Sequence, residues 1–379
     1  MSPLNINHVV EDMQVLSGGV PAVVRQLTRR LVLEGHKAAV TYCIGDASDL
    51  NDVASTVRYS PNGLLRYWSH SSELETAFSD ISPPNNNGCC IHHIHGMWKA
   101  PQILAAKACR KLSMPFLFSV HGMLEPWLWK RQGVTNYAKK VLFWRLFARK
   151  HMNSSAIIHA ITPRERDRLH TLLPGSKIEV IPNAIQLGSI NNPSNIKTRT
   201  KKFLFLGRIE PIKGVDILIN AFAHSGLGPE WCLDIVGPSF SDTYLSTLQN
   251  LVHSHSLSNC IKFHGPLIGD EKKVLLQTAW AMVTPSHSEV IGLVNLEAAD
   301  NFLPSITTHQ TGLRDWTEGG GLLISPEVIP LSNALIEASF WTSEEQFDRG
   351  VASRSLVKTR YSWDAVMPLW ESLYYQISS

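Results

Sequence analysis

Short apolar runs alternate with longer amphipathic stretches along the whole chain, and this alternation restricts the possible fold more than any other feature. A short apolar run suits a strand buried on both faces, and a longer amphipathic stretch suits a helix that covers a sheet. Strand–helix–strand units that follow one another in this way build parallel sheets. The expected strands are 6–10, 37–43, 90–94, 115–120, 156–161, 178–181, 203–207, 232–237, 261–265, 281–285, 305–308 and 321–325.

The same rhythm occurs twice, which predicts two domains. The 379 residues exceed what one ordinary core holds, since domains of about 100–200 residues are usual. A polar, turn-forming stretch at 186–202 lacks periodicity and is expected to link the halves. Each half should form an α/β domain that binds ligands beyond the carboxyl ends of its strands. Helices are expected at 20–34, 101–112, 137–151, 163–173, 215–223, 242–253, 271–278 and 293–299.

Composition argues against several other classes of protein. Apolar residues make up 44% of the chain and charged residues 18%, which is typical of a globular protein rather than a disordered one. The formal net charge of +3 provides no general attraction to nucleic acid. The six cysteines include no Cys-x-x-Cys pair, so reduced thiols are expected. Because we see neither a signal peptide nor an apolar stretch of about 18 residues, we expect a cytoplasmic protein.

The strongest local signal is the sequence from Ser288 to Glu297, SEVIGLVNLE, which follows the expected strand 281–285. Gly292 would open a helix whose first N–H groups are unpaired and attract phosphate. Glu289 would lie in the loop before this helix and Glu297 inside it. One carboxylate could then hold a sugar and the other a ribose, on either side of the phosphates. The alternative is that the first glutamate is a turn residue and the second an exposed helix position.

The second signal is the sequence from Phe203 to Gly214, FLFLGRIEPIKG, in which a buried strand ends in a glycine turn. Arg208 and Lys213 flank the start of the next helix. Together they can neutralise a diphosphate, the arginine through a two-pronged fork and the lysine as a point charge. In a site that excludes water they also stabilise a departing diphosphate as its charge grows. The alternative is a pair of solvated surface cations.

Two weaker signals lie in the first half of the chain. Gly18 and Gly19 follow the first strand, where glycines let the backbone approach a phosphate closely. A plain turn is the alternative for this pair. His95 and His121 each follow a strand, in the similar sequences HGMW and HGML, and we expect both imidazoles to point toward a ligand.

A metal site is not expected in this region. His92, His93 and His95 occur close together, which at first suggests a cluster of metal ligands. A strand, however, points successive side chains to opposite faces of its sheet, and no carboxylate lies near these residues in the sequence. The histidines are therefore interpreted as structural residues or as parts of a polar site.

Together these motifs resemble glycosyltransferase family four, whose members are retaining enzymes of the GT-B fold and include bacterial exopolysaccharide and lipopolysaccharide glycosyltransferases. The resemblance implies an α/β protein with two facing Rossmann-like domains. It implies an acceptor-side domain at 1–185, completed by a terminal helix in 359–379 that crosses back to it, and a nucleotide-sugar-binding domain at 186–358. The motifs are Gly18-Gly19, Ile181-Pro182-Asn183-Ala184, Gly207-Arg208 with Lys213-Gly214, and Glu289 with Glu297.

The resemblance also implies a role for each matching residue. The counterparts of Arg208 and Lys213 bind the donor diphosphate. The counterpart of Glu289 holds hydroxyls of the donor sugar, that of Glu297 binds the ribose, and His121 matches a histidine near the transferred sugar. Backbone contacts to the donor are implied for Gly18, Gly19, Ile291, Gly292 and Leu293. The implied catalytic residues are His121, Arg208, Lys213 and Glu289.

The implied reaction moves a sugar, with retention of its anomeric configuration, from a nucleotide-diphosphate donor such as UDP-glucose or UDP-glucuronic acid. The acceptor would be a glycan or a lipid-linked molecule in polysaccharide biosynthesis. Since side-chain cations take the place of a metal ion, neither a metal nor another cofactor is expected. A nucleotide-sugar epimerase, a phosphorylase on the same scaffold and a non-catalytic nucleotide-sugar-binding subunit are the alternatives.

The segment 127–151 is basic and aromatic, with seven Lys or Arg residues and no acidic residue. Such a segment can lie in the interface of an anionic membrane, which would place the protein at the inner face of the membrane. The alternative is that Val141, Leu142 and Leu146 pack on the sheet while the cations are solvated. Interleaved aromatic residues also suit single-stranded nucleic acid, but the low net charge argues against that partner.

Overall fold

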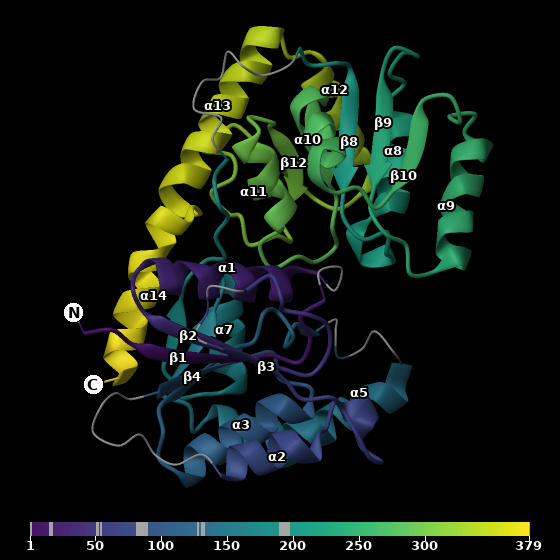
Figure 1. The fold of residues 1–379 in the computed structure, drawn as a ribbon. Coiled ribbons are helices and arrows are strands. Elements are labelled where there is room, and N and C mark those ends of the chain that lie inside the picture. Colours follow the sequence, from purple (N-terminus) through teal and green to yellow (C-terminus); the bar gives the residue numbers. More distant parts are fainter. Residues whose placement is uncertain are drawn as a thin grey trace. The chain divides into compact units, whose positions relative to one another are not determined.

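The structure is a computed structural model that describes residues 2–14, 18–50, 53, 55–80, 90–126, 129, 133–188 and 198–378. Its internal contacts divide the chain into two compact units (Figure 1). Unit 1 comprises Met1–Ala184 and Val366–Ser379, and unit 2 comprises Ile185–Ala365. The chain therefore leaves unit 1 once and returns to it in its last residues.

Unit 1 contains a seven-stranded sheet with the strand order β3-β2-β1-β4-β5-β6-β7. All neighbouring strands are parallel. The order reverses between β1 and β4, and such a switch point is where open α/β sheets bind ligands. The strands are β1 (Asn5–Val9), β2 (Lys37–Tyr42), β3 (Ser55–Arg58), β4 (Cys90–His95), β5 (Phe116–Ser119), β6 (Ile157–Ala160) and β7 (Ile178–Val180).

Unit 2 contains a six-stranded parallel sheet with the order β10-β9-β8-β11-β12-β13. Its switch point lies between β8 and β11. The expectation of two Rossmann-like α/β domains is confirmed. The strands are β8 (Lys202–Leu206), β9 (Cys232–Val236), β10 (Ile261–Gly265), β11 (Ala281–Thr284), β12 (Ser305–Thr308) and β13 (Leu322–Ile324).

Helices connect the strands and cover the sheets (Figure 1). In unit 1 they are α1 (Gly19–Leu33), η2 (Arg66–Trp68), α2 (Ser72–Ser79), α3 (Ala100–Lys111), α5 (Gly133–Phe143), η3 (Trp144–Ala148), α6 (Arg149–Met152) and α7 (Pro163–Leu172). In unit 2 they are η5 (Pro211–Lys213), α8 (Val215–His224), α9 (Asp242–Ser254), α10 (Gly269–Thr278), α11 (Leu293–Asp300), α12 (Val328–Ser339) and α13 (Ser343–Arg360), and α14 (Trp363–Ser378) follows.

The two faces of the unit 2 sheet bury separate apolar clusters, as the strand period of two requires. Phe203 and Phe205 of β8 point into a cluster that also contains residues of α8 and α12. Leu204 and Leu206, which alternate with them, point into a cluster with residues of α10 and α11. All four side chains are at least 95% buried, with exposures from 0% to 5%. Such strands read as continuous apolar runs, which is why the sequence predicts them well.

Every expected strand is present, and β3 is one more that the sequence analysis missed. All four residues of β3 are exposed, so this edge strand has no apolar run to reveal it. Helices α2, α12 and α13 were missed as well. Helix α13 does begin with a readable signal, because Thr342 and Glu345 form a capping box at its first turn.

Helix α14 returns the chain to unit 1 through its buried face. Val366, Met367, Trp370, Leu373 and Tyr374 are at most 4% exposed, and their spacing places them on one side of the helix. The expected return at residue 359 precedes the observed one at residue 366 because α13 continues through unit 2 to residue 360.

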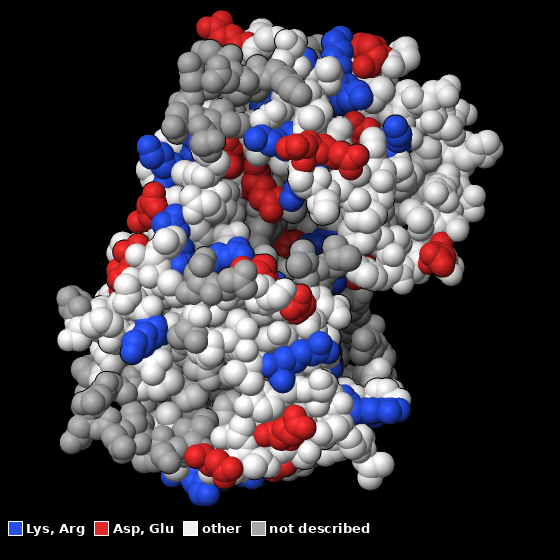
Figure 2. Space-filling view, viewed as in Figure 1, with Lys and Arg blue, Asp and Glu red and all other residues white. Residues whose placement is uncertain are grey.

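On the face in Figure 2, Lys and Arg side chains lie among Asp and Glu without an extended field of one sign. Among the described residues, no helix combines the length and the apolar character that crossing a bilayer requires. The cysteines that the structure describes form no disulfide with one another, and they are Cys43, Cys90, Cys109, Cys232 and Cys260. Cys89 lies outside the described residues, as do residues 189–197 of the expected linker.

Six histidines of unit 1 lie in and beside its sheet. Burial penalises the charged imidazolium form, so these rings are neutral at physiological pH. Burial lowers the pKa to about 3 for His8 and His121, to about 4 for His92 and His159, and well below the ordinary value for His93 and His95.

We therefore expect unit 1 to lose stability as the pH falls below about 6.5, the pKa of a histidine in an unfolded chain. Unfolded rings take up protons that folded rings reject. Each buried ring thus lowers the free energy of unfolding by about 1.4 kcal/mol per pH unit between that value and its lower folded pKa. Urea unfolding at several pH values, followed by tryptophan fluorescence, measures this slope.

The matched control for this prediction is His92→Leu, which removes one titrating ring. The slope of unfolding free energy against pH should decrease by the contribution of that ring. An unfolding midpoint that is the same at about pH 7 and about pH 5 would contradict the expectation.

Candidate functional site

Lys213 and Glu289 are 76 residues apart in sequence and form an ion pair in unit 2. Lys213 ends η5, which follows β8, and Glu289 lies in the loop between β11 and α11. Because β8 and β11 are neighbours at the switch point, the segments beyond their carboxyl ends meet. The two side chains are only 18% and 24% exposed. The structure thus brings together one residue from each of the two strongest sequence signals.

The ion pair lines a small pocket at the carboxyl ends of β8 and β11. A cation and a carboxylate side by side suit a ligand that carries a negative group next to hydroxyls. The polar side chains around the pocket belong to Lys213, Thr284, Ser286, Glu289, Asn295 and Thr311, and the backbone of Gly292 also contributes.

Gly214 positions Lys213. It lies between η5 and α8 with φ of 68°, in the left-handed region. A Cβ atom at this position would lie 2.3 Å from the carbonyl oxygen of Pro285, which follows β11. Only glycine allows this approach of the two backbones. The turn that carries Lys213 therefore packs closely against the backbone of Pro285, in the segment that leads from β11 to Glu289.

A similar close approach joins the ends of β8 and β9. A Cβ atom on Gly237 would lie 1.8 Å from the carbonyl oxygen of Gly207. The N–H of Gly207 donates to the carbonyl of Val236 at 3.0 Å, and the N–H of Ile209 donates to that of Pro238 at 2.8 Å. The glycine turn before Arg208 is therefore fixed by main-chain bonds.

Gly292 precedes helix α11 as expected. It has φ of 63°, and a Cβ atom there would lie 2.8 Å from Nδ2 of Asn295 and 3.3 Å from Cγ of Glu289. Ile291 is 3% exposed, so its side chain is not available to a ligand. Leu293 is the first residue of the helix. The first N–H groups of α11 have no partner within the helix, and such a helix start suits an anion.

The other two charged residues of the predicted site also form ion pairs. Nη1 of Arg208 lies 3.2 Å from Oε1 of Glu210, and the arginine side chain is 43% exposed. Glu297 lies in α11, and its Oε2 is 2.5 Å from Nζ of Lys272 on α10. Each predicted donor-binding charge therefore has a partner of opposite sign. The two lysine–glutamate pairs lie at either end of the motif from 288 to 297.

Asn295 is a polar residue of this site that the sequence reasoning did not single out. Its side chain is fully buried, and its Oδ1 accepts hydrogen bonds from Thr284 at 3.0 Å and from Ser305 at 2.9 Å. Ser305 in turn accepts from the indole N–H of Trp316 at 2.9 Å, which fixes the direction of its own proton. Nδ2 of Asn295 has no partner within the described part of the chain. In the sequence, only the position of Asn295 inside the motif from 288 to 297 indicated that it belongs to the site.

The glycine pair predicted in the first half lies at the start of α1. Gly18 precedes the helix with φ of 112°, and Gly19 is its first residue. A Cβ atom on Gly18 would meet nothing within 4 Å, so its conformation rather than lack of space favours glycine. Residues 15–17, which precede the pair, lie outside the described residues.

His121 is half-buried just after β5, at the carboxyl edge of the unit 1 sheet. His95 does not match its expectation, because it is 1% exposed and both of its ring nitrogens form hydrogen bonds to other imidazoles. The two histidines therefore have different environments despite their similar sequences, because His95 is buried and His121 is half-buried. Whether a strand-end side chain faces a ligand depends on what covers it.

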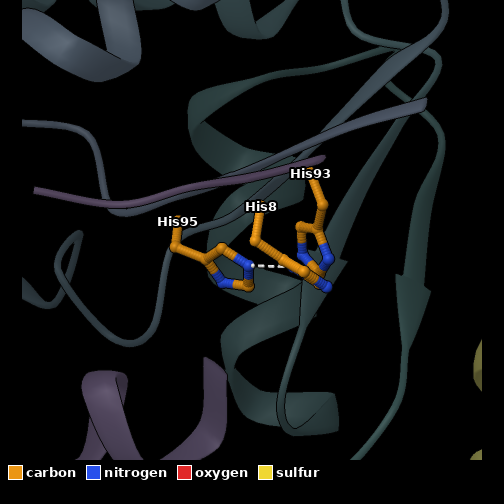
Figure 3. A group of neighbouring side chains, drawn as sticks. All are labelled: His8, His93 and His95. Carbon is orange, nitrogen blue, oxygen red and sulfur yellow. Dashed lines mark hydrogen bonds between the residues drawn. The ribbon is translucent and has the colours of Figure 1, made fainter. Parts of the chain in front are cut away.

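His8, His93 and His95 lie close enough to raise the question of a metal site, with one nitrogen of each within 4.8 Å of the others (Figure 3). A metal ion needs a free lone pair from each ring. His93 instead bonds Tyr374 through Nδ1 and Ser119 through Nε2. Both nitrogens of His95 are likewise engaged. The geometry favours hydrogen-bonded rings over metal ligands, and the absence of a metal stays a prediction.

The chain matches two described protein families, one in each half. Residues 17–188 match the family described as Glycosyltransferase Family 4, and residues 189–338 match the family described as Glycosyl transferases group 1. The D-inositol 3-phosphate glycosyltransferase of Acidothermus cellulolyticus is 29% identical over 165 residues, 39% of this chain and 37% of that protein. The one from Corynebacterium jeikeium is 32% identical over 136 residues, 34% and 32% of the two chains. The chain thus spans about a third of the length of these relatives.

Solved structures resemble the whole chain. Sucrose-phosphate synthase from Thermosynechococcus elongatus has a TM-score of 0.74 at 20% identity, covering 99% of both chains. HepE of Anabaena in complex with UDP and glucose has a TM-score of 0.73 at 17% identity, covering 98% and 99%. A UDP-forming α,α-trehalose-phosphate synthase from Burkholderia xenovorans has a TM-score of 0.73 at 14% identity, covering 99% and 100%. At these identities the likeness shows the fold alone.

The approach of Gly214 to Pro285 leads to a prediction for unit 2. Gly214→Ala should destabilise the unit by about 1–3 kcal/mol beyond the strain of a left-handed alanine, because the new methyl group overlaps a carbonyl oxygen. Gly226→Ala is the matched control, since Gly226 has φ of 62° and its Cβ atom would meet nothing within 4 Å. Urea unfolding of both variants measures the difference, and equal losses of stability would refute the argument.

Proposed function

The chain belongs to the family-4 type of glycosyltransferases, and we propose that it transfers a sugar from a nucleotide-diphosphate donor to a hydroxyl group of an acceptor. The observation that carries the proposal is the meeting of Lys213 and Glu289 beside the start of α11. A sugar diphosphate presents an anion and a set of hydroxyls within a few bonds of each other. The pair offers a matching cation and carboxylate at the switch point of the unit 2 sheet.

Donor binding would break the ion pair between Lys213 and Glu289. The diphosphate would take Lys213 as its counterion and would add Arg208, whose exposed guanidinium suits a two-pronged contact. The hydroxyls of the donor sugar would then donate to the carboxylate of Glu289. The ribose hydroxyls would approach Glu297, and the backbone of 291–293 would meet sugar or phosphate oxygens.

The chemical step would depend on stabilising the diphosphate as it departs. Its negative charge grows as the glycosidic bond breaks, and Arg208 and Lys213 would neutralise that charge in a partly buried site. We propose retention of configuration by attack from the face of departure, with the acceptor hydroxyl losing its proton to the leaving phosphate. The two cations make a divalent metal unnecessary in this scheme.

The identities of the donor and the acceptor are further parts of the proposal. UDP is the proposed nucleotide, and the Anabaena protein solved with UDP and glucose and the UDP-forming synthase from Burkholderia support this choice by their shared fold. Glucose and glucuronic acid are the proposed sugars. A glycan or lipid-linked acceptor in polysaccharide biosynthesis, at the cytoplasmic side of a membrane, completes the proposal.

Arg208→Ala and Lys213→Ala should each reduce turnover by about 10²–10³-fold, as loss of one preorganised charge at a transition state does elsewhere. Release of UDP from UDP-sugars in the presence of candidate acceptors measures the rate. Lys273→Ala is the matched control, because Lys273 is an exposed lysine on α10. Near-normal rates in both site variants would refute the assignment.

The same assay separates the alternatives. An epimerase would convert the free nucleotide sugar without any acceptor, and a phosphorylase would need inorganic phosphate. A non-catalytic subunit would bind the donor, raising the unfolding temperature, without turnover. Loss of transfer in EDTA with recovery in Mg²⁺ or Mn²⁺ would refute the proposed independence from metal ions.

A membrane contact is proposed for the helical segment 133–152. Leu142 and Leu146 are 58% and 59% exposed and lie one turn apart, whereas Trp144 and Ala148 are buried. The alternative, in which Val141, Leu142 and Leu146 pack on the sheet, holds for Val141, which packs against the unit 1 core, but not for the two exposed leucines. The exposed cations of this segment are Lys139, Arg145, Arg149 and Lys150, and the earlier part of the predicted segment, including Trp127, Lys130 and Arg131, lies outside the described residues.

Vesicles of phosphatidylglycerol and phosphatidylcholine should bind the protein, and binding should weaken as salt is raised. Replacing both exposed leucines, Leu142→Ser with Leu146→Ser, should reduce binding more than tenfold, since a fully buried leucine contributes about 1.5–3 kcal/mol. Leu33→Ser is the control, because Leu33 is 74% exposed on α1. Sedimentation with vesicles measures the partition, and equal binding by all variants would contradict the proposal.

A further inference from the structure

Three imidazoles of unit 1 form a chain of hydrogen bonds that ends at His121. His8 lies on β1, His95 ends β4, and His121 follows β5. Nδ1 of His8 is 2.9 Å from Nε2 of His95, a bond drawn in Figure 3. Nδ1 of His95 is 2.9 Å from Nε2 of His121. Because β1 and β4 adjoin at the switch point of the sheet, the chain runs from the buried core toward a predicted ligand-binding edge.

The protons of this chain can be arranged in only two ways. Burial keeps the rings neutral, with the pKa lowered to about 3 for His8 and His121 and well below the ordinary value for His95. A neutral imidazole carries one proton, so a ring that takes part in two such bonds donates one and accepts the other. The N–H groups therefore point either from His8 toward His121 or in the opposite direction.

The buried end of the chain decides between the two directions. Nε2 of His8 has no hydrogen-bond partner among the residues that the structure describes. If the N–H groups pointed toward His8, this nitrogen would carry an unpartnered proton in the core. The opposite direction leaves only a bare lone pair there. Buried N–H groups without partners are rarer than under-satisfied acceptors, so Nδ1–H of His8 donates to His95, and Nδ1–H of His95 donates to His121.

We infer that His8 and His95 are positioning residues that fix the tautomer of His121 and so present its Nδ1–H as a hydrogen-bond donor to the ligand. Nε2 of His121 accepts the bond from His95 and cannot donate, so the proton of this ring lies on Nδ1. The inference rests on the proposed function and on the role that the family resemblance implies for His121, a position near the transferred sugar. Hydroxyl and ring oxygens of a sugar are acceptors for such a donor.

The backbone at His121 is held as well as its ring. His121 and Gly122 have φ of 51° and 75°, two successive left-handed residues. The buried carboxylate of Glu165 accepts from the N–H of Gly122 at 2.6 Å and from that of Ile161 at 2.7 Å. Glu165 lies in the first turn of α7, where Thr162 caps the helix. A donor fixed in both backbone and tautomer needs no reorganisation when the ligand arrives.

A second chain in the same core provides an internal reference. The carbonyl of Ile181 accepts from Nε2–H of His159 at 2.7 Å, so Nδ1 of His159 accepts from the hydroxyl of Ser119 at 2.7 Å. Ser119 then accepts from Nε2–H of His93 at 2.6 Å, and Nδ1 of His93 accepts from the hydroxyl of Tyr374 at 2.7 Å. This chain therefore contains Nε2–H tautomers, whereas the chain to His121 contains Nδ1–H tautomers.

Long-range ¹H–¹⁵N correlation spectra of protein labelled with ¹⁵N-histidine distinguish the two tautomers of each ring. At neutral pH we expect the Nδ1–H form for His8, His95 and His121 and the Nε2–H form for His93 and His159. An Nε2–H form or an imidazolium at His121 would overturn the inference. This measurement requires no substrate and therefore does not depend on the proposed function.

Variants of His8 test the functional part. His8→Asn retains a side-chain N–H near the position of Nδ1, whereas His8→Leu removes it and leaves Nε2 of His95 without its donor. We expect His8→Leu to convert His121 partly to the other tautomer and to lower kcat about 3- to 10-fold, as for loss of one neutral hydrogen bond. His8→Asn should restore both. The KM for the donor should change less than kcat.

The matched control is His92→Leu, because His92 is a buried histidine of β4 that bonds Asn7 rather than this chain. It should lower stability without changing the spectrum of His121 or kcat. Unchanged turnover in a folded His8→Leu variant would refute the positioning role. If the expected tautomers appear but the wild-type protein transfers no sugar, the proposed function fails and the hydrogen-bond direction stands.

Discussion

Unit 2 depends on how closely the backbone beyond β8 approaches the backbone beyond β11. At Gly214 the approach leaves no room for a Cβ atom, because the carbonyl oxygen of Pro285 would lie 2.3 Å from it. This contact sets the turn that carries Lys213 against the strand that leads to Glu289. The ion pair is therefore a consequence of backbone packing at the switch point of a parallel sheet. Side-chain attraction alone would not hold it there, because a partly exposed pair contributes little.

The charged residues of the proposed donor site neutralise one another in the structure. Lys213 pairs with Glu289, Arg208 with Glu210, and Lys272 with Glu297. Such pairing keeps several partly buried charges compatible with folding, since an uncompensated charge in this position is costly. The proposed ligand is one that can replace both members of a pair at once, because it carries phosphate oxygens and hydroxyls together.

Unit 1 uses a different kind of polar interior. Five of its imidazoles have pKa values lowered by burial and are held as neutral rings in two hydrogen-bonded chains, those of His8, His93, His95, His121 and His159. Neutral rings avoid the cost of buried charge, but each must have its single proton on the correct nitrogen. In one chain the carbonyl of Ile181 can only accept, so it fixes the direction of the hydrogen bonds that lead to it. In the other chain the direction is set by Nε2 of His8, which has no partner among the described residues. The group at the end of each chain thus determines which nitrogen of every imidazole carries the proton.

The sequence by itself determined the strands of both sheets, the two-unit organisation and the order of the motifs, because buried parallel strands and glycine turns leave local patterns. It did not reveal β3, whose residues are exposed, and it could not separate His95 from His121, which have similar neighbours in sequence. The pairing of Lys213 with Glu289, the network at Asn295 and the hydrogen bonds of the histidines were decided only by the tertiary structure. The periodicity of apolar residues indicates whether a segment forms a strand or a helix and which of its faces is buried. The contacts of a single side chain, and the direction of its hydrogen bonds, depend on residues that lie far apart in sequence and meet only in the folded protein.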